Sequence, residues 1–173
     1  MNNNNRKRTC CFFGHRKITD EEKLKVRLSE IIENLIVNEN VDTFLLGSRS
    51  EFDNLCREIL SEKKELHSHI QRIYVRAEYP DIDKDYENYL LRWCDATYFP
   101  KRLKNAGKAV YVERNHEMID AADICVVYFK SDYLPPKRKS SKRDSFAYQP
   151  KSGTELAYKY AIKTKKEIIN VSD

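Results

Sequence analysis

The fold is decided by residues 124–129, which read ICVVYF. This apolar run is rich in β-forming residues and too short to cross a membrane, so it predicts a strand buried on both faces, as in a parallel sheet. Downstream, residues 152–165 show helical spacing and begin with small side chains. A buried strand that leads into such a helix typically holds a phosphate, because the first helical N–H groups lack partners and the helix dipole is positive there.

The same alternation of strand and helix extends along the rest of the chain. The predicted strands are residues 9–13, 43–46, 70–75, 124–129 and 167–171, and the predicted helices are residues 20–38, a segment capped by Ser50, and residues 85–93, 115–122 and 152–165. Thr19 and Glu22 fit a capping box at the first helix. The pattern predicts an α/β fold: a Rossmann-like, doubly wound, mostly parallel sheet of about five or more strands with helices on both faces.

Length and charge predict one domain with one unusual loop. The 173 residues suit a disordered tail at residues 1–8 and a single domain at 9–173, with a basic loop insertion at 131–150. Residues 130–151 carry seven Lys and Arg against two Asp, which accounts for the whole net charge of +5. The chain shows no secretory signal, no membrane span and no CxxC among its five cysteines, so we expect a cytoplasmic protein with reduced, buried thiols.

The expected partner is a nucleotide-type small molecule. The neutral charge outside one loop argues against a nucleic-acid partner, and the loop offers only Phe146 and Tyr148 for base stacking. No cofactor is expected, since the chain has neither GxGxxG nor a P-loop. No metal is expected, because His67 and His69 have no acidic or thiol group at ligand spacing. The sequence is compatible with a homo-oligomer.

Polar groups follow three predicted strands, and we expect them to meet the helix start at residue 152 along the carboxyl edge of the sheet. The expected ligand-binding residues are Gly14, His15, Arg16, Gly47, Ser48, Arg49, Asp53, Arg76, Glu78, Asn115, Ser152, Gly153, Thr154 and Glu155.

Several of these residues also have a purely structural interpretation. Gly14-His15-Arg16 fits a surface turn as well as a ligand contact. Asp53 can close a capping box with Ser50, or it can accept hydrogen bonds from a ribose or a base. Asn115 is a competent helix N-cap, and Ser152 with Glu155 fits a second capping box.

Four segments resemble bacterial SLOG-superfamily proteins: CCFFGHR at 10–16, GSRSEFD at 47–53, RNHEMID at 114–120 and KSGT at 151–154. The resemblance spans nearly the whole chain and is close to the small SLOG proteins of Firmicutes. It implies a Rossmann-like fold related to the Lonely Guy phosphoribohydrolases, with a pocket for nucleotides or nucleotide-derived signals such as ADP-ribose derivatives. Those enzymes carry a Pro-Gly-Gly-x-Gly-Thr-x-Glu-Glu loop, whereas this chain has one glycine there and Glu155 directly after Thr154.

The leading hypothesis is a binding module for an ADP-ribose- or NAD-type ligand or a nucleoside phosphate, acting as a sensor or by sequestration. One alternative is an N-glycosidic nucleotide hydrolase, with Glu155 as the catalytic residue and Arg16 or Arg76 on the phosphate. The other is association with nucleic acid through the basic loop, whose cations are Lys137, Arg138, Lys139, Lys142 and Arg143. That loop either closes over the ligand or is an inert insertion.

Overall fold

The computed structural model describes residues 6–104, 107–134 and 152–172. Along the chain the elements are β1 (Arg8–Gly14), α1 (Glu21–Val37), β2 (Val41–Leu46), α2 (Glu51–Leu66), β3 (Gln71–Val75), α3 (Lys84–Leu90), β4 (Ala96–Tyr98), α4 (Ala109–Ala121), β5 (Ile124–Tyr128), α5 (Gly153–Lys163) and β6 (Glu167–Asn170). The predicted basic loop falls mostly outside the described residues.

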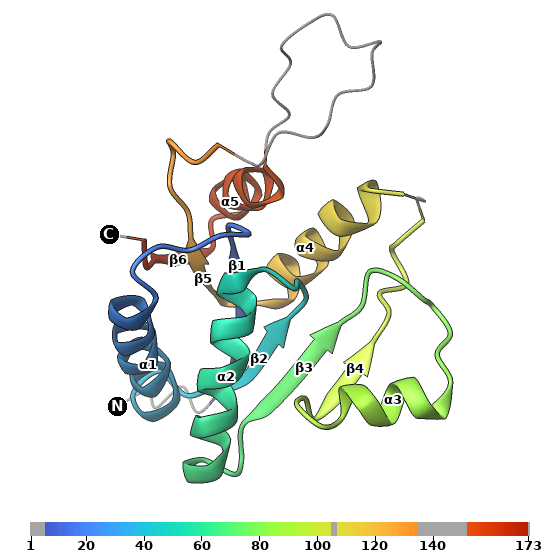
Figure 1. Cartoon of the computed structure of the whole chain (residues 1–173), viewed down its shortest axis with the longest axis horizontal. Coiled ribbons are helices and arrows are strands. Elements are labelled where there is room, and N and C mark those ends of the chain that lie inside the picture. The colour runs from blue at the N-terminus through green and yellow to red at the C-terminus, as the bar shows by residue number, and fades with distance from the viewer. Residues whose placement is uncertain (1–5, 105–106, 135–151, 173) are drawn as a thin grey trace, which may run out of the picture.

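All six of these strands form one sheet in the order β4-β3-β2-β1-β5-β6, and every neighbouring pair is parallel. The order reverses at β1: the chain moves outward to β4 and then crosses to β5 on the other side of β1 (Figure 1). This arrangement confirms the predicted Rossmann-like, doubly wound α/β fold.

Side chains of the central strand alternate between two apolar cores. Cys10 and Phe12 of β1 pack in the cluster that α1 and α2 cover. Cys11 and Phe13 point the other way, into the cluster covered by α4 and α5. Because β1 is buried on both faces, its sequence is continuously apolar rather than alternating. All five cysteines are free and buried, as expected.

Two predicted helix N-caps are wrong. Asp20 precedes α1 in the left-handed conformation (φ 51°) and makes no side-chain cap, while the Thr19 hydroxyl lies 3.1 Å from the Tyr128 hydroxyl instead of capping the helix. Helix α4 begins at Ala109, six residues earlier than predicted, so Asn115 lies inside the helix and is not an N-cap.

Two differences concern strands. β1 begins at Arg8, inside the expected tail, and the Arg8 guanidinium pairs with Glu39 at 2.7 Å and Glu167 at 2.6 Å. β4 was not predicted, because Ala96–Tyr98 is a three-residue edge strand whose first side chain is exposed. Such a strand carries no apolar run to mark it.

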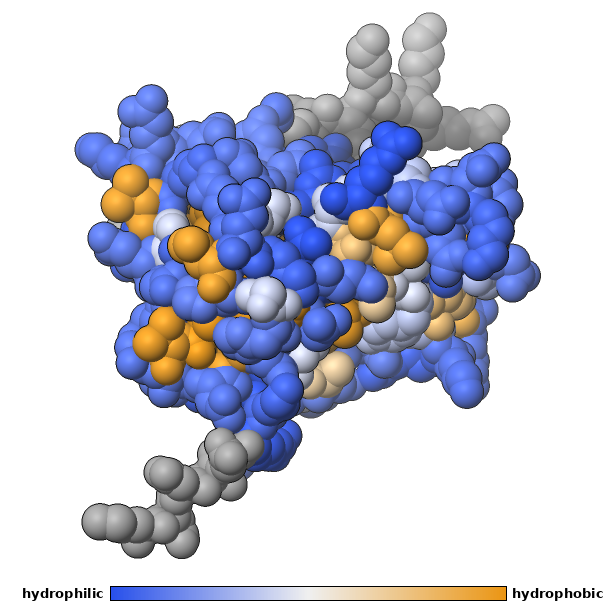
Figure 2. Space-filling view, turned by 90° about the horizontal axis from the view of Figure 1, so that it is seen from below, coloured by the Kyte–Doolittle hydropathy of each residue, from blue (hydrophilic) through white to orange (hydrophobic). Residues whose placement is uncertain are grey.

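The surface is mostly hydrophilic. On the face seen in Figure 2, the exposed hydrophobic side chains form small, separate patches, which is usual for a globular protein. Among the helices of the described ranges, none combines the length and the apolar character that crossing a membrane requires.

Candidate functional site

The loops that follow β1 and β2 meet at the carboxyl edge of the sheet. The backbone N–H of Glu51, at the start of α2, donates to the carbonyl of Arg16 at 3.0 Å. The Glu51 carboxylate accepts from the N–H of Ile18 at 3.0 Å and pairs with the Lys17 ammonium at 2.5 Å. These bonds fix the β1 loop against the first turn of α2, as parallel strands with adjacent carboxyl ends require.

Ser50 caps α2 as predicted, but Asp53 does not close a capping box, because the N–H of Ser50 donates to Ser48 Oγ at 3.1 Å. Ser50 Oγ accepts from the N–H of Asp53 at 3.0 Å and donates to Asp53 Oδ2 at 2.5 Å. The Asp53 side chain is buried, and its other oxygen, Oδ1, has no partner. Burial raises the pKa of Asp53, and the hydrogen bond from Ser50, the charge of Arg114 and the hydroxyl and N–H of Ser48 partly oppose that shift.

Arg114 of α4 contacts the turn between β2 and α2. Its guanidinium donates to the carbonyl of Gly47, and its Nε donates to Asn115 Oδ1 at 3.1 Å. Burial lowers the pKa of Arg114. A Cβ at Gly47 would lie 2.6 Å from Met118 Sδ and 2.7 Å from Arg114 Cδ. Close packing against α4 therefore explains the glycine at this position.

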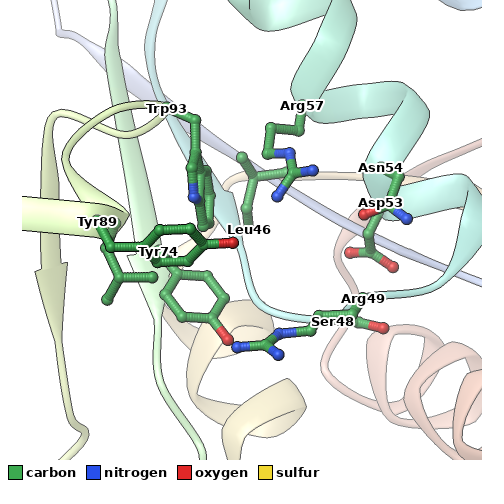
Figure 3. A pocket seen from close by; sticks show the side chains of 10 residues that line it. Leu46, Ser48, Arg49, Asp53, Asn54, Arg57, Tyr74, Tyr89 and Trp93 are labelled. Carbon is green, nitrogen blue, oxygen red and sulfur yellow. The ribbon is translucent and has the colours of Figure 1, made fainter. Parts of the chain in front are cut away.

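A cavity of about 200 Å³ opens beside this turn, between α2, α3 and the ends of β2 and β3. Figure 3 shows Asp53 on one wall and Tyr74, Tyr89 and Trp93 on the opposite wall. The full lining is Leu46, Ser48, Arg49, Asp53, Asn54, Arg57, Tyr74, Tyr89, Leu90 and Trp93.

Two arginines of the lining are held by aromatic residues. The Arg57 guanidinium lies 4.8 Å from the centre of the Trp93 ring, and Arg49 donates to the Tyr86 hydroxyl at 3.1 Å. Trp93 Nε1 is buried and has no hydrogen-bond partner. The cavity thus combines aromatic surface with two cations.

The end of β1 is occupied largely by the protein's own contacts. A Cβ at Gly14 would lie 2.4 Å from Phe52 Cδ1. The buried His15 ring accepts from the N–H of Lys130 at 2.8 Å and stacks on Tyr133 with ring centres 3.9 Å apart. Burial lowers the pKa of His15. Among these predicted site residues, Arg16 alone is exposed, and it makes no ion pair with any residue in the described ranges.

The predicted residues after β3 stabilise the local loop. Arg76 is buried and donates to the carbonyls of Tyr79 at 2.6 Å and Pro80 at 3.2 Å. Glu78 accepts from the Tyr111 hydroxyl of α4. Neither residue lines the cavity.

The start of α5 forms the second predicted cap, which is confirmed. Ser152 Oγ accepts from the N–H of Glu155 at 3.1 Å. Thr154 is buried, a Cβ at Gly153 would meet open space, and the Glu155 carboxylate pairs with Lys159 at 2.6 Å. Of the fourteen predicted site residues, Ser48, Arg49 and Asp53 line the cavity, and those of α5 do not.

The aromatic wall was not predicted from the sequence. Two of its members, Tyr89 and Trp93, are four residues apart, a spacing that would place them on one side of a helix. Tyr86 and Tyr89 do stack, with ring centres 6.1 Å apart. The helix was predicted at residues 85–93, but α3 ends at Leu90 and Trp93 lies in the turn that follows it. Spacing alone therefore does not show that Tyr89 and Trp93 face Asp53.

The comparisons with known proteins bear on the fold. No family model matches the chain, and no curated protein matches it. Among solved structures, DNA processing protein A from Helicobacter pylori, described as binding single-stranded DNA, is similar with a TM-score of 0.56 and 15% sequence identity. The match covers 92% of this chain and 63% of the other, so this chain spans less than two thirds of that protein. At this identity the likeness shows a shared fold alone.

This likeness corrects one expectation. The charge pattern argued against a nucleic-acid partner, and this expectation is corrected: a protein of similar fold is described as binding single-stranded DNA, so the fold is compatible with such a partner. The cations counted for that argument, Lys137 to Arg143, lie outside the described residues.

Proposed function

We propose that the chain is a nucleotide-binding module that holds a base in the cavity beside Asp53. The observation that carries this proposal is the combination of aromatic side chains with two guanidinium groups in one cavity. Ligand sites are typically apolar or aromatic hollows with a few convergent polar groups. The cavity of about 200 Å³ is smaller than the roughly 300–1,000 Å³ of drug-sized sites. This size suits one base with its sugar and phosphate outside.

Charge around the cavity indicates where the phosphate lies. A neighbouring hollow shares Asn54, Arg57 and Trp93 with the cavity and is otherwise lined largely by glutamates, among them Glu58 and Glu62. Like charges repel, so this side disfavours a phosphate. The exposed guanidinium groups of Arg16 and Arg49 offer positive charge for the phosphate on the other side. We infer that the phosphate extends toward the β1 and β2 loops.

The resemblance of four segments to SLOG proteins supports the same class of ligand. Within that class, the size of the cavity favours a nucleoside phosphate over an ADP-ribose- or NAD-type ligand. The hydrolase alternative depends on Glu155, which pairs with Lys159 on α5 and does not line the cavity. The binding role is therefore the better supported of the two.

Binding of single-stranded nucleic acid is the second candidate function, and the fold shared with a single-stranded DNA-binding protein favours it. The cavity would then hold one base of a strand on its aromatic wall, as such proteins do. Counterion release would make this binding fall steeply with salt, whereas a mononucleotide with one phosphate would show a shallow dependence.

Calorimetric titration of the purified chain with the nucleoside monophosphates and with a mixed-sequence DNA oligonucleotide tests both candidates. We expect a monophosphate to bind, and Arg49→Gln or Tyr89→Ala to weaken it about tenfold, the size of one lost charge-assisted or stacking contact. Arg27→Gln, on the exposed face of α1, is the control and should bind normally. Salt-sensitive binding of the oligonucleotide alone would support the second candidate, and binding of neither would overturn both.

A further inference from the structure

A row of three tyrosine rings leads out of the cavity. Tyr89, which lines the cavity, stacks on Tyr86 with ring centres 6.1 Å apart, and Tyr86 meets Tyr79 edge-on at 6.2 Å. Tyr89 is 50% exposed, and Tyr79, at the outer end of this tyrosine row, is 62% exposed. Exposed rings that gather beside a pocket are typical of interaction surfaces. The tyrosine row therefore extends the aromatic surface of the cavity to the outside.

The backbone fixes the outer end of the row. Tyr79 has the left-handed conformation (φ 57°), which is an outlier for a bulky residue and needs support from its surroundings. The buried Arg76 guanidinium gives this support by donating to the carbonyls of Tyr79 and Pro80. The loop thus presents the Tyr79 ring from a preformed backbone, which lowers the entropy lost when a partner stacks on it.

Two exposed arginines contact the rings of the row. Arg49 donates to the Tyr86 hydroxyl at 3.1 Å, and the Arg92 guanidinium lies 6.0 Å from the centre of the Tyr89 ring. A guanidinium beside an aromatic ring can bind a phosphate while a base stacks on the ring. The row thus offers both parts of a nucleotide a contact.

The acidic residues of the same segment limit the attraction for phosphate. Three of them are engaged within the protein: Glu78 accepts from the Tyr111 hydroxyl, Asp83 accepts from the N–H of Tyr86, and Glu87 pairs with Lys84. The other two, Asp81 and Asp85, are exposed and offset the charges of the two arginines. Stacking on the rings must therefore supply most of the binding energy at this surface.

We propose that the tyrosine row carries a single strand of nucleic acid, with one base in the cavity and the next bases stacked along the row as far as Tyr79. Proteins that bind single strands stack successive bases on aromatic side chains, and such stacking tolerates any base. A row that continues from the cavity fits a ligand of several nucleotides better than a single one. This inference rests on the second candidate function and adds to it the length and the path of the ligand.

Ligands of increasing length test the row without changing the protein. Deoxyadenosine monophosphate and its di-, tri- and tetranucleotides are titrated into the wild-type chain by calorimetry. We expect the affinity to rise about tenfold with each nucleotide up to the trinucleotide, the size of one base–aromatic stack, and then to level off. Equal affinities at every length would overturn the row and leave binding in the cavity intact. No binding at any length would overturn the proposed function as well.

Changing Tyr79 tests the path of the strand. Tyr79→Asn removes the outermost ring and suits the left-handed conformation, which asparagine readily adopts, while Tyr79→Phe keeps the ring. Because the side chain is exposed, both variants should melt at the temperature of the wild-type chain. We expect Tyr79→Asn to lose the gain from the di- to the trinucleotide and to bind the monophosphate normally, whereas Tyr79→Phe keeps the gain. A gain that survives in Tyr79→Asn, or that disappears at raised salt, would place the strand on cations elsewhere and overturn the row.

Discussion

Replacing Ser50 by alanine is expected to destabilise the fold by more than the loss of a helix cap. Ser50 Oγ accepts from the N–H of Asp53 at 3.0 Å and donates to its buried carboxylate at 2.5 Å. Loss of a serine cap costs about 1 kcal/mol. Loss of the hydroxyl donor to the carboxylate adds about 1–3 kcal/mol, because the oxygen remains buried. The free energy of unfolding should fall by about 2–4 kcal/mol at pH 7.

Ser152→Ala is the matched control. Ser152 caps α5 with the same geometry, at 3.1 Å from the N–H of Glu155, but supports no buried carboxylate, so its loss should cost about 1 kcal/mol. Because the pKa of Asp53 is raised in the folded state, acid neutralises its carboxyl while the unfolded chain is still ionised. The excess loss in Ser50→Ala should therefore shrink as the pH falls. Urea unfolding of the two variants at pH 7 and at acidic pH measures this excess loss of unfolding free energy. Equal losses in the two variants would refute the reasoning.

Further predictions concern the β1 and α5 loops. Gly14→Ala should lower the free energy of unfolding by about 1–3 kcal/mol in urea, because the added Cβ would lie 2.4 Å from Phe52 Cδ1. Gly153→Ala, whose Cβ meets open space, is the control and should leave it unchanged. Similar losses in the two variants would contradict this account. Burial lowers the pKa of His15 in the folded state. The neutral ring therefore contributes stability that is fully present above about pH 6.5, the pKa of an unfolded histidine. This contribution should be lost as the pH falls through the lower pKa of the folded state. His15→Gln should flatten that part of a thermal-melting series between pH 7.5 and 5.5, and an unchanged slope would count against it. Arg16→Glu should weaken nucleotide binding in a titration and leave the melting temperature unchanged, because the side chain is exposed.

Much of the fold follows from local patterns in the sequence. The run at residues 124–129 is apolar without interruption, because β5 is buried on both faces, and its strand character is therefore visible directly. The caps at Ser50 and Ser152 are equally local, since each spans three residues. The start of α4 is different: Lys108 makes no side-chain cap there, and the competent cap residue Asn115 lies in the helix interior.

The site is less predictable because it joins distant segments. The rule for doubly wound sheets places the ligand where the strand order reverses, beside β1 and β5. There the structure has His15 stacked on Tyr133 and Gly14 against Phe52. The cavity lies instead beyond β2 and β3. Two of its lining residues, Asp53 of α2 and Trp93, are forty positions apart in the sequence. Such a pairing depends on the packing of α3, which no short motif encodes.

Fluorescence of Trp93 tests nucleotide binding in the cavity most directly. The chain has one tryptophan, and it lines the cavity. Titration with each nucleoside monophosphate should, for the one that binds, change its emission saturably, since a stacked base alters the surroundings of the indole, and Arg49→Gln should shift the midpoint to higher concentration. Unchanged Trp93 emission at ligand concentrations where calorimetry shows binding would place the ligand elsewhere and contradict the account.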